Sequence, residues 1–153
     1  MSIYLKIPNL TGESAATDYK GQFELAALAW NGKLVAQAHG ASATDFTSIS
    51  VSKLVTRHSP ELMLLMASQK NIGKIVITLT KPGADSDLPA DVYSLDDAVL
   101  TGFSQTVDTL SQPTELLTFA FSRATLTQFS YNKYNGNVSE DTHYWNANTN
   151  MGH

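Results

Sequence analysis

The chain has 153 residues, enough for one domain that buries a core of its own. It contains no cysteine, which excludes disulfide bonds, cysteine-ligated zinc and a cysteine nucleophile. A formal net charge of −4 and the lack of a Lys/Arg cluster argue against nucleic-acid binding, and no run approaches the roughly 18 apolar residues that would favour membrane insertion.

Charged residues make up 16% of the chain, against about 25% in a typical soluble domain. Serine and threonine take their place. Such a surface is typical of β-structure, and it also suits a protein that covers much of its outside by contact with copies of itself. Composition alone does not separate these two interpretations.

Alternating apolar residues predict a succession of strands. The first is carried by Ile3, Leu5 and Ile7. Further strands are expected at 23–30, 46–55, 74–80, 92–103 and 114–131, and Gly102 predicts a bulge or a close backbone approach.

One helix is predicted at about 60–70, between two of these strands. Ser59 is the expected N-cap and Pro60 the first helical residue, while Lys70 falls in the last turn. The apolar spacing makes Leu62, Leu65 and Met66 the candidate packing face of the helix. One helix among seven or eight expected strands gives a predicted fold class that is mainly β, a small antiparallel β-barrel of two sheets with one flanking α-helix.

Two segments show no such periodicity. The stretch Lys33–Asp45 contains Gly40 and many small residues, and we expect an extended, mobile excursion there. The tail, residues 132–153, is rich in asparagine and lacks apolar periodicity except near Tyr144 and Trp145; we take it as an extension of the same domain.

A search for chemistry yields no candidate catalytic, cofactor-binding or metal site. The four histidines are isolated in the sequence: His39, His58, His143 and His153. Asp96 and Asp97 are adjacent, so a strand would turn them to opposite faces, and a solvated turn or bulge is the better interpretation. Gly102-Phe103-Ser104 begins a nucleophile elbow, but Thr106 stands where its second glycine is needed. We expect no enzymatic activity and no cofactor.

Several motifs together resemble the Hcp family, the tube proteins of bacterial type VI secretion systems. Their order and spacing carry the resemblance, since each alone is weakly specific. They are Tyr4–Pro8 followed by Gly12-Glu13-Ser14, then Phe23–Trp30, Ser59-Pro60-Glu61-Leu62, Ile75–Lys81, Leu117–Phe121 and Tyr144-Trp145-Asn146. In the last motif Tyr144 stands where the family has glycine.

The resemblance implies one Hcp-like domain over residues 1–153 and no catalysis. It implies hexameric rings that stack into a tube inside a contractile sheath, with a spike at the tip and effector proteins in the lumen. It also implies a protein made in the bacterial cytoplasm and secreted, and the start of the chain shows no cleavable signal peptide. The excursion falls where the family carries a loop that touches the next ring, which makes a candidate ring-stacking loop of Leu34, Val35, Ala36, Gln37, Ala38, His39 and Gly40.

Two other classes stay open at this point. A small monomeric β-sandwich could bind carbohydrate or another ligand through exposed aromatic rings, for which the candidates are Trp30, Tyr93, Tyr144 and Trp145. A small hydrolase would have to use His58 or His143.

Overall fold

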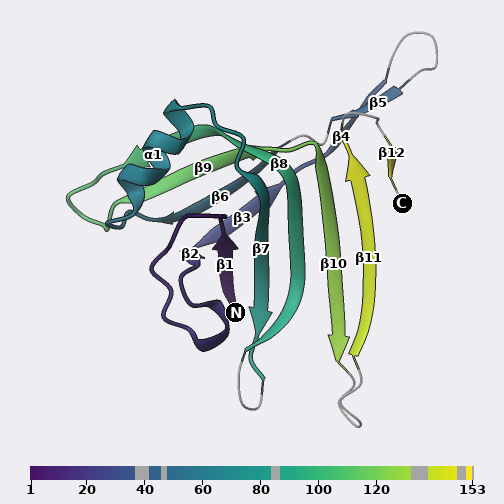
Figure 1. The fold of residues 1–153 in the computed structure, drawn as a ribbon, viewed down its shortest axis with the longest axis horizontal. Helices are drawn as coiled ribbons and strands as arrows, with labels where there is room; N and C mark the ends of the chain where they lie inside the picture. The colour runs from purple at the N-terminus through teal and green to yellow at the C-terminus, as the bar shows by residue number, and fades with distance from the viewer. Residues whose placement is uncertain (37–41, 46–47, 84–86, 132–137, 148–150, 153) are drawn as a thin grey trace.

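The computed structural model describes residues 1–36, 42–45, 48–83, 87–131, 138–147 and 151–152, and Figure 1 shows their arrangement. This part of the chain is mainly β, with one α-helix, α1 (Ser59–Ala67), and one short 3₁₀ turn, η1 (Thr17–Tyr19). The strands are β1 (Ser2–Lys6), β2 (Phe23–Leu25), β3 (Ala27–Trp30), β4 (Lys33–Ala36), β5 (Ser42–Asp45), β6 (Ser48–Leu54), β7 (Gly73–Lys81), β8 (Leu88–Thr106), β9 (Thr114–Ala120), β10 (Arg123–Tyr131), β11 (Val138–Asn146) and β12 (Met151–Gly152).

The antiparallel pairings form a circuit. It runs from β1 through β7, β8, β9 and β6 to β3. It returns to β1 through β2, which continues into β3 with a break at Ala26, whose N–H donates to the Ser52 carbonyl (2.7 Å). The predicted mainly β fold of two sheets with one flanking helix is confirmed.

The long strand β8 belongs to both sheets. Its first half pairs with β7 and β10 in the first sheet, which also contains β1, β2, β11 and β12. Its second half pairs with β9 in the second sheet, which also contains β3 and β6. Between the halves Asp97 takes a left-handed φ of 52°, and the Ser122 hydroxyl donates to its carboxylate (2.7 Å). Asp96 and Asp97 therefore mark a bend in the strand, as the sequence indicated.

The bulge predicted at Gly102 is also confirmed. The register between β8 and β9 shifts between Leu100 and Gly102. A Cβ atom at Gly102 would lie 3.1 Å from the Thr118 Cβ, so the missing side chain permits a close approach of the two strands.

The core lies between the two sheets and under α1. It includes residues from both sheets and from the helix, among them Leu5, Phe23, Ile77, Phe119 and Leu62, all fully buried. The helix crosses one end of the barrel and packs mainly on β8. Each sheet therefore contributes one apolar face to a single core.

Three predictions about the chain's later half need correction. The expected strand at 114–131 is two strands, because the chain turns a corner at Phe121 and Ser122 and passes from one sheet to the other. Inward positions are odd-numbered before the corner (Leu117, Phe119) and even-numbered after it (Ala124). The total of seven or eight expected strands is accordingly too low for the described residues.

The tail is the third correction, since β11 pairs with β10 along its whole length and β12 pairs with the end of β11. Residues 138–143 of β11 are exposed, so this outer strand has no need of a buried apolar face. Its sequence therefore lacks the periodicity by which a strand is recognised.

The helix ends differ from the prediction as well. His58 is at the N-cap position and makes no side-chain capping bond, and the helix ends at Ala67. Gln69 then adopts a left-handed φ of 53°, so Lys70 lies beyond the helix instead of in its last turn.

Candidate assembly surfaces

The predicted packing face of α1 points toward the core. Leu62 is fully buried, and Leu65 and Met66 are half-buried against the core cluster. Met63 and Leu64, on the outer side, are 54% and 66% exposed. The helix thus packs on the core with one face and presents apolar side chains to the outside with the other.

A buried ion pair lies beneath the start of α1. Lys53 Nζ donates to Glu115 Oε1 at 2.7 Å, and both side chains are 0% exposed. Gln105 Nε2 donates to the other carboxylate oxygen (3.1 Å), and Lys53 Nζ also donates to the Leu54 carbonyl (2.7 Å). The two charges therefore have the partners that buried ions require.

Ser59 joins this network. Its hydroxyl donates to Glu115 Oε1 (2.9 Å) and accepts from the Thr56 N–H (3.0 Å). The predicted N-cap role is wrong, because the helix starts at Ser59 itself and its hydroxyl faces the buried carboxylate. Ser59 instead ties the first turn of α1 to strand β9.

This network was not predicted, although the sequence contains a signal for it. Lys53 follows Ile49 and Val51 at a spacing of two, and Glu115 precedes Leu117 and Phe119 in the same way. Period-two alternation places both charged residues on the inward face. The two strands are paired so that Lys53 is directly opposite Glu115.

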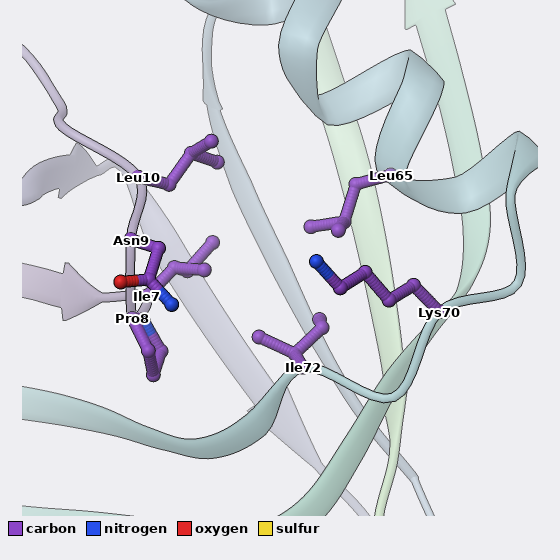
Figure 2. Close-up of a pocket in the computed structure, with 7 residues that line it drawn as sticks. All are labelled: Ile7, Pro8, Asn9, Leu10, Leu65, Lys70 and Ile72. Atoms are coloured by element: carbon purple, nitrogen blue, oxygen red, sulfur yellow. The ribbon is translucent and has the colours of Figure 1, made fainter.

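Several hollows border the helix, and one of about 570 Å³ lies between the end of α1 and β8, beside Met66, Gln69 and Thr101. A groove of about 340 Å³ lies at the start of α1, with a mostly apolar lining that includes Val55, Pro60, Met63 and Phe103. A pocket of about 110 Å³ lies at the other end, between Leu10, Leu65 and Ile72. Figure 2 shows the Lys70 side chain reaching across this pocket toward the segment after β1.

The predicted excursion Lys33–Asp45 contains a hairpin. Strands β4 and β5 pair from Lys33↔Asp45 to Ala36↔Ser42 as a separate two-stranded sheet, so the described parts of this segment are extended, as expected, and are also paired with each other. Figure 1 shows the pair projecting from the body of the molecule. Leu34, Val35 and Ala36 belong to β4; Gln37, Ala38, His39 and Gly40 lie outside the described residues.

The titratable residues that might serve a hydrolase are scattered. The His58 ring meets the Phe23 ring edge-on with centroids 6.1 Å apart, and His143 pairs with Asp141 at 3.1 Å on the exposed strand β11. Within the part of the chain that the structure describes, no group of three or more His, Cys, Asp or Glu side chains could hold a metal ion. His39 and His153 lie outside it.

The candidate aromatic platform is divided between different contacts. Trp30 packs edge-on against Tyr93, with ring centroids 5.2 Å apart. The Arg123 guanidinium lies 3.8 Å from the ring centroid of Tyr144, in strand β11. Trp145, the next residue, points to the opposite face of that strand.

Tyrosines of the first sheet and of η1 have raised pKa values. Burial is the main cause at Tyr19, Tyr93 and Tyr131, with the Asp18 and Asp91 carboxylates adding to it at Tyr19 and Tyr93. The Tyr131 hydroxyl donates to the Pro89 carbonyl (2.7 Å). These hydroxyls are therefore protonated at neutral pH, and that of Tyr131 acts as a hydrogen-bond donor.

The glycine-containing turn after β1 is fixed by its backbone. Gly12 N–H donates to the Gly21 carbonyl (2.7 Å), and a Cβ at Gly12 would lie 2.6 Å from the Gln22 carbonyl. Glu13 Oε1 accepts from the Glu24 N–H (3.1 Å). The motif Gly12-Glu13-Ser14 thus joins the first turn to strand β2.

Comparison with known proteins agrees with this architecture. The family model described as "Type VI secretion system effector, Hcp" matches residues 4–128. A solved structure described as a type six secretion system protein is 17% identical, with a TM-score of 0.85 and 99% of each chain covered. Hcp1 from Salmonella typhimurium is 21% identical, with a TM-score of 0.78 and 99% and 98% coverage. Hcp2 from the same organism is 20% identical, with a TM-score of 0.70 and 95% of both chains covered.

At these identities the structural likeness shows the fold, and the family match shows the relationship. A search of the curated proteins found no match. The fold and the match define a type VI secretion protein of the structural, tube-forming class. The chain belongs to the Hcp family. This family is secreted and forms ring assemblies, and the alternative of a monomeric carbohydrate-binding module is not supported.

Proposed function

We propose that this chain is the tube subunit of a type VI secretion system. Six copies form a ring, and rings stack into a tube that lies inside the sheath, carries the spike at its tip and can hold effector proteins in its lumen. The protein is made in the bacterial cytoplasm and leaves the cell by this route. It acts without catalysis, cofactor or metal. The family match over residues 4–128 is the observation that carries the proposal.

The outer face of the second sheet supports an assembled state. Strand pairing places a set of uncharged residues on this face, exposed or half-buried in the single chain. They are Ala27, Ala29, Ser48, Ser50, Ser52, Leu54, Thr114, Leu116, Thr118 and Ala120. The centres of protein interfaces are depleted of charged residues, so this face suits contact with another copy.

The projecting hairpin supports the stacking of rings. It forms a sheet separate from the barrel, and it lies at the end of the molecule opposite the β8–β9 turn (Figure 1). We assign contact with the next ring to the segment from Leu34 to Gly40, which begins in β4. The stretch includes residues 37–40, which lie outside the described structure.

Light scattering coupled to size exclusion tests the ring. Six chains of 16.6 kDa give about 100 kDa, and a cyclic assembly hides its contact surfaces without leaving a free end. A 16.6 kDa species at all micromolar concentrations would overturn the proposal. Electron microscopy then tests the hairpin: a variant that lacks residues 35–42 should keep single rings and lose stacked ones.

A further inference from the structure

Exposed apolar side chains concentrate at one end of the molecule. Of the eight large apolar residues that are exposed in the described structure, six lie on α1, at the end of β6, at the start of β9 or in the β8–β9 turn. They are Leu54, Met63, Leu64, Val107, Leu110 and Leu116. Figure 1 places these elements together at the left end. Exposed apolar patches of this kind mark protein interaction sites.

Part of this end is concave. The groove beside α1 holds about 340 Å³ and is formed mainly by Val55, Pro60, Met63 and Phe103. Arg57 also lines it; the residue is exposed and has no ion-pair partner in the described part of the chain. The groove thus accepts apolar side chains and offers one cation beside them.

Another part is convex. The tip, defined here as the β8–β9 turn at residues 107–111, presents Val107 at 75% exposure and Leu110 at 92%. Asp108 lies between them, and its Oδ1 accepts from the Leu110 N–H (2.9 Å), which fixes the turn. The described residues give Asp108 no cationic partner. The tip therefore offers two aliphatic side chains and one anion.

We infer that the tip of one copy docks in the groove of a second copy. Leu110 enters the apolar part of the groove, and Asp108 meets Arg57. The inference rests on the proposed function and deepens it, because it names a contact between subunits. Tip and groove lie at the same end of the molecule, so docking joins copies at one level along the tube, as neighbours within a ring are. Successive rings would instead be joined through the hairpin at the opposite end.

Disulfide cross-linking tests this contact, and a chain without cysteine makes every cross-link assignable. A tagged Leu110→Cys variant is mixed with an untagged Met63→Cys variant, and the mixture is oxidised and separated by mass. Docked cysteines face each other at an effective concentration of about millimolar. Undocked cysteines meet only at the micromolar total concentration of the protein. We therefore expect the tagged–untagged dimer to form roughly a hundredfold faster than with Val138→Cys as partner, an exposed position on β11.

Two results would overturn the inference. One is equal cross-linking of Leu110→Cys to Met63→Cys and to Val138→Cys. The other is faster cross-linking of Met63→Cys to a hairpin cysteine, such as Val35→Cys, which would assign the groove to the hairpin of the next ring.

A serine substitution provides the assembly readout. Leu110→Ser should raise the concentration at which the assembly dissociates by about tenfold or more, as the loss of an interface anchor does. Val138→Ser, which removes an exposed apolar side chain elsewhere, should leave it unchanged. If wild-type protein assembles and Leu110→Ser assembles equally well, the inference fails while the ring stands; a monomeric wild type would instead remove the proposed function.

Discussion

Two ion pairs in different regions of the molecule show how burial decides what a charge contact does. Lys53 and Glu115 meet at 2.7 Å with both side chains 0% exposed, under the helix-covered end. His143 and Asp141 meet at 3.1 Å on the outer strand β11, with side chains 70% and 79% exposed. The distances are similar. The first pair organises four hydrogen-bonding neighbours around the start of α1, whereas the second is surrounded by water.

The two regions that contain these ion pairs differ in the same way. At the helix-covered end, the polar groups of the Lys53–Glu115 network are satisfied inside the protein and each has a defined partner. Along β10 and β11 the side chains contact one another across an exposed strand pair, as Arg123 does with Tyr144. Stability is therefore expected to depend strongly on single side chains in the first region and weakly in the second.

Removing one member of the buried pair should give the largest effect. Glu115→Ala leaves Lys53 buried without a counter-charge, so the free energy of unfolding should fall by about 3–5 kcal/mol. Asp141→Ala is the matched control and should change it by less than about 0.5 kcal/mol. Urea unfolding at one fixed protein concentration measures both, because assembly also contributes to apparent stability.

The double variant Lys53→Met/Glu115→Leu sharpens this test. Apolar replacement of both partners removes the unpaired charge, so most of the lost stability should return, although Ser59 and Gln105 lose their acceptor. A double variant as unstable as Glu115→Ala would show that the hydrogen bonds to the carboxylate matter more than the charge of Lys53.

The next largest change in unfolding free energy is expected from substitutions on the two faces of α1. Leu62 is fully buried, so Leu62→Ala should cost about 2–5 kcal/mol in unfolding free energy. Leu64→Ala, two residues on and 66% exposed, should change it by less than about 0.5 kcal/mol. Equal losses in thermal or urea unfolding would mean that the helix is buried on both faces in the assembled protein.

Alkaline pH should have a smaller effect, in the first sheet and η1. Burial raises the pKa of Tyr19, Tyr93 and Tyr131, so above about pH 10 the unfolded chain loses these protons before the folded protein does. The contribution of these tyrosines to the free energy of unfolding is therefore fully present below that pH and is lost as pH rises further. Tyr93→Phe should lessen the fall between pH 10 and 11; an unchanged slope would remove Tyr93 from the explanation.

Burial also decides which parts of the structure the sequence could reveal. Strands that bury one face, such as β7 with Ile75 and Ile77, alternate visibly and were predicted. Strand β11 buries little, so its residues follow no apolar period, and only pairing with β10 makes it a strand. The corner at Ser122 was missed for a related reason, because Leu117, Phe119 and Phe121 run without a break into the turn.

The assembly surfaces also include features that the sequence could predict and features that it could not. The inward face of α1 follows from the spacing of Leu62, Leu65 and Met66. The groove beside it requires Val55 and Phe103 to meet from strands distant in sequence, and no local pattern contains that information. The buried position of Lys53 could have been predicted from alternation, but its partner Glu115 depends on the register between β6 and β9.

The place of β8 in both sheets has a consequence for how the chain folds. It pairs with the strand before it and the strand after it across short connections, and with β10 soon afterwards, so these contacts close small loops at low entropic cost. Strand β1, by contrast, pairs with β7 across most of the first half of the chain, as Ser2 with Thr80. Contacts between distant segments form slowly. Residues 73–131 should therefore become protected from hydrogen exchange first during refolding, and the N-terminal strand should be the last to join the sheet.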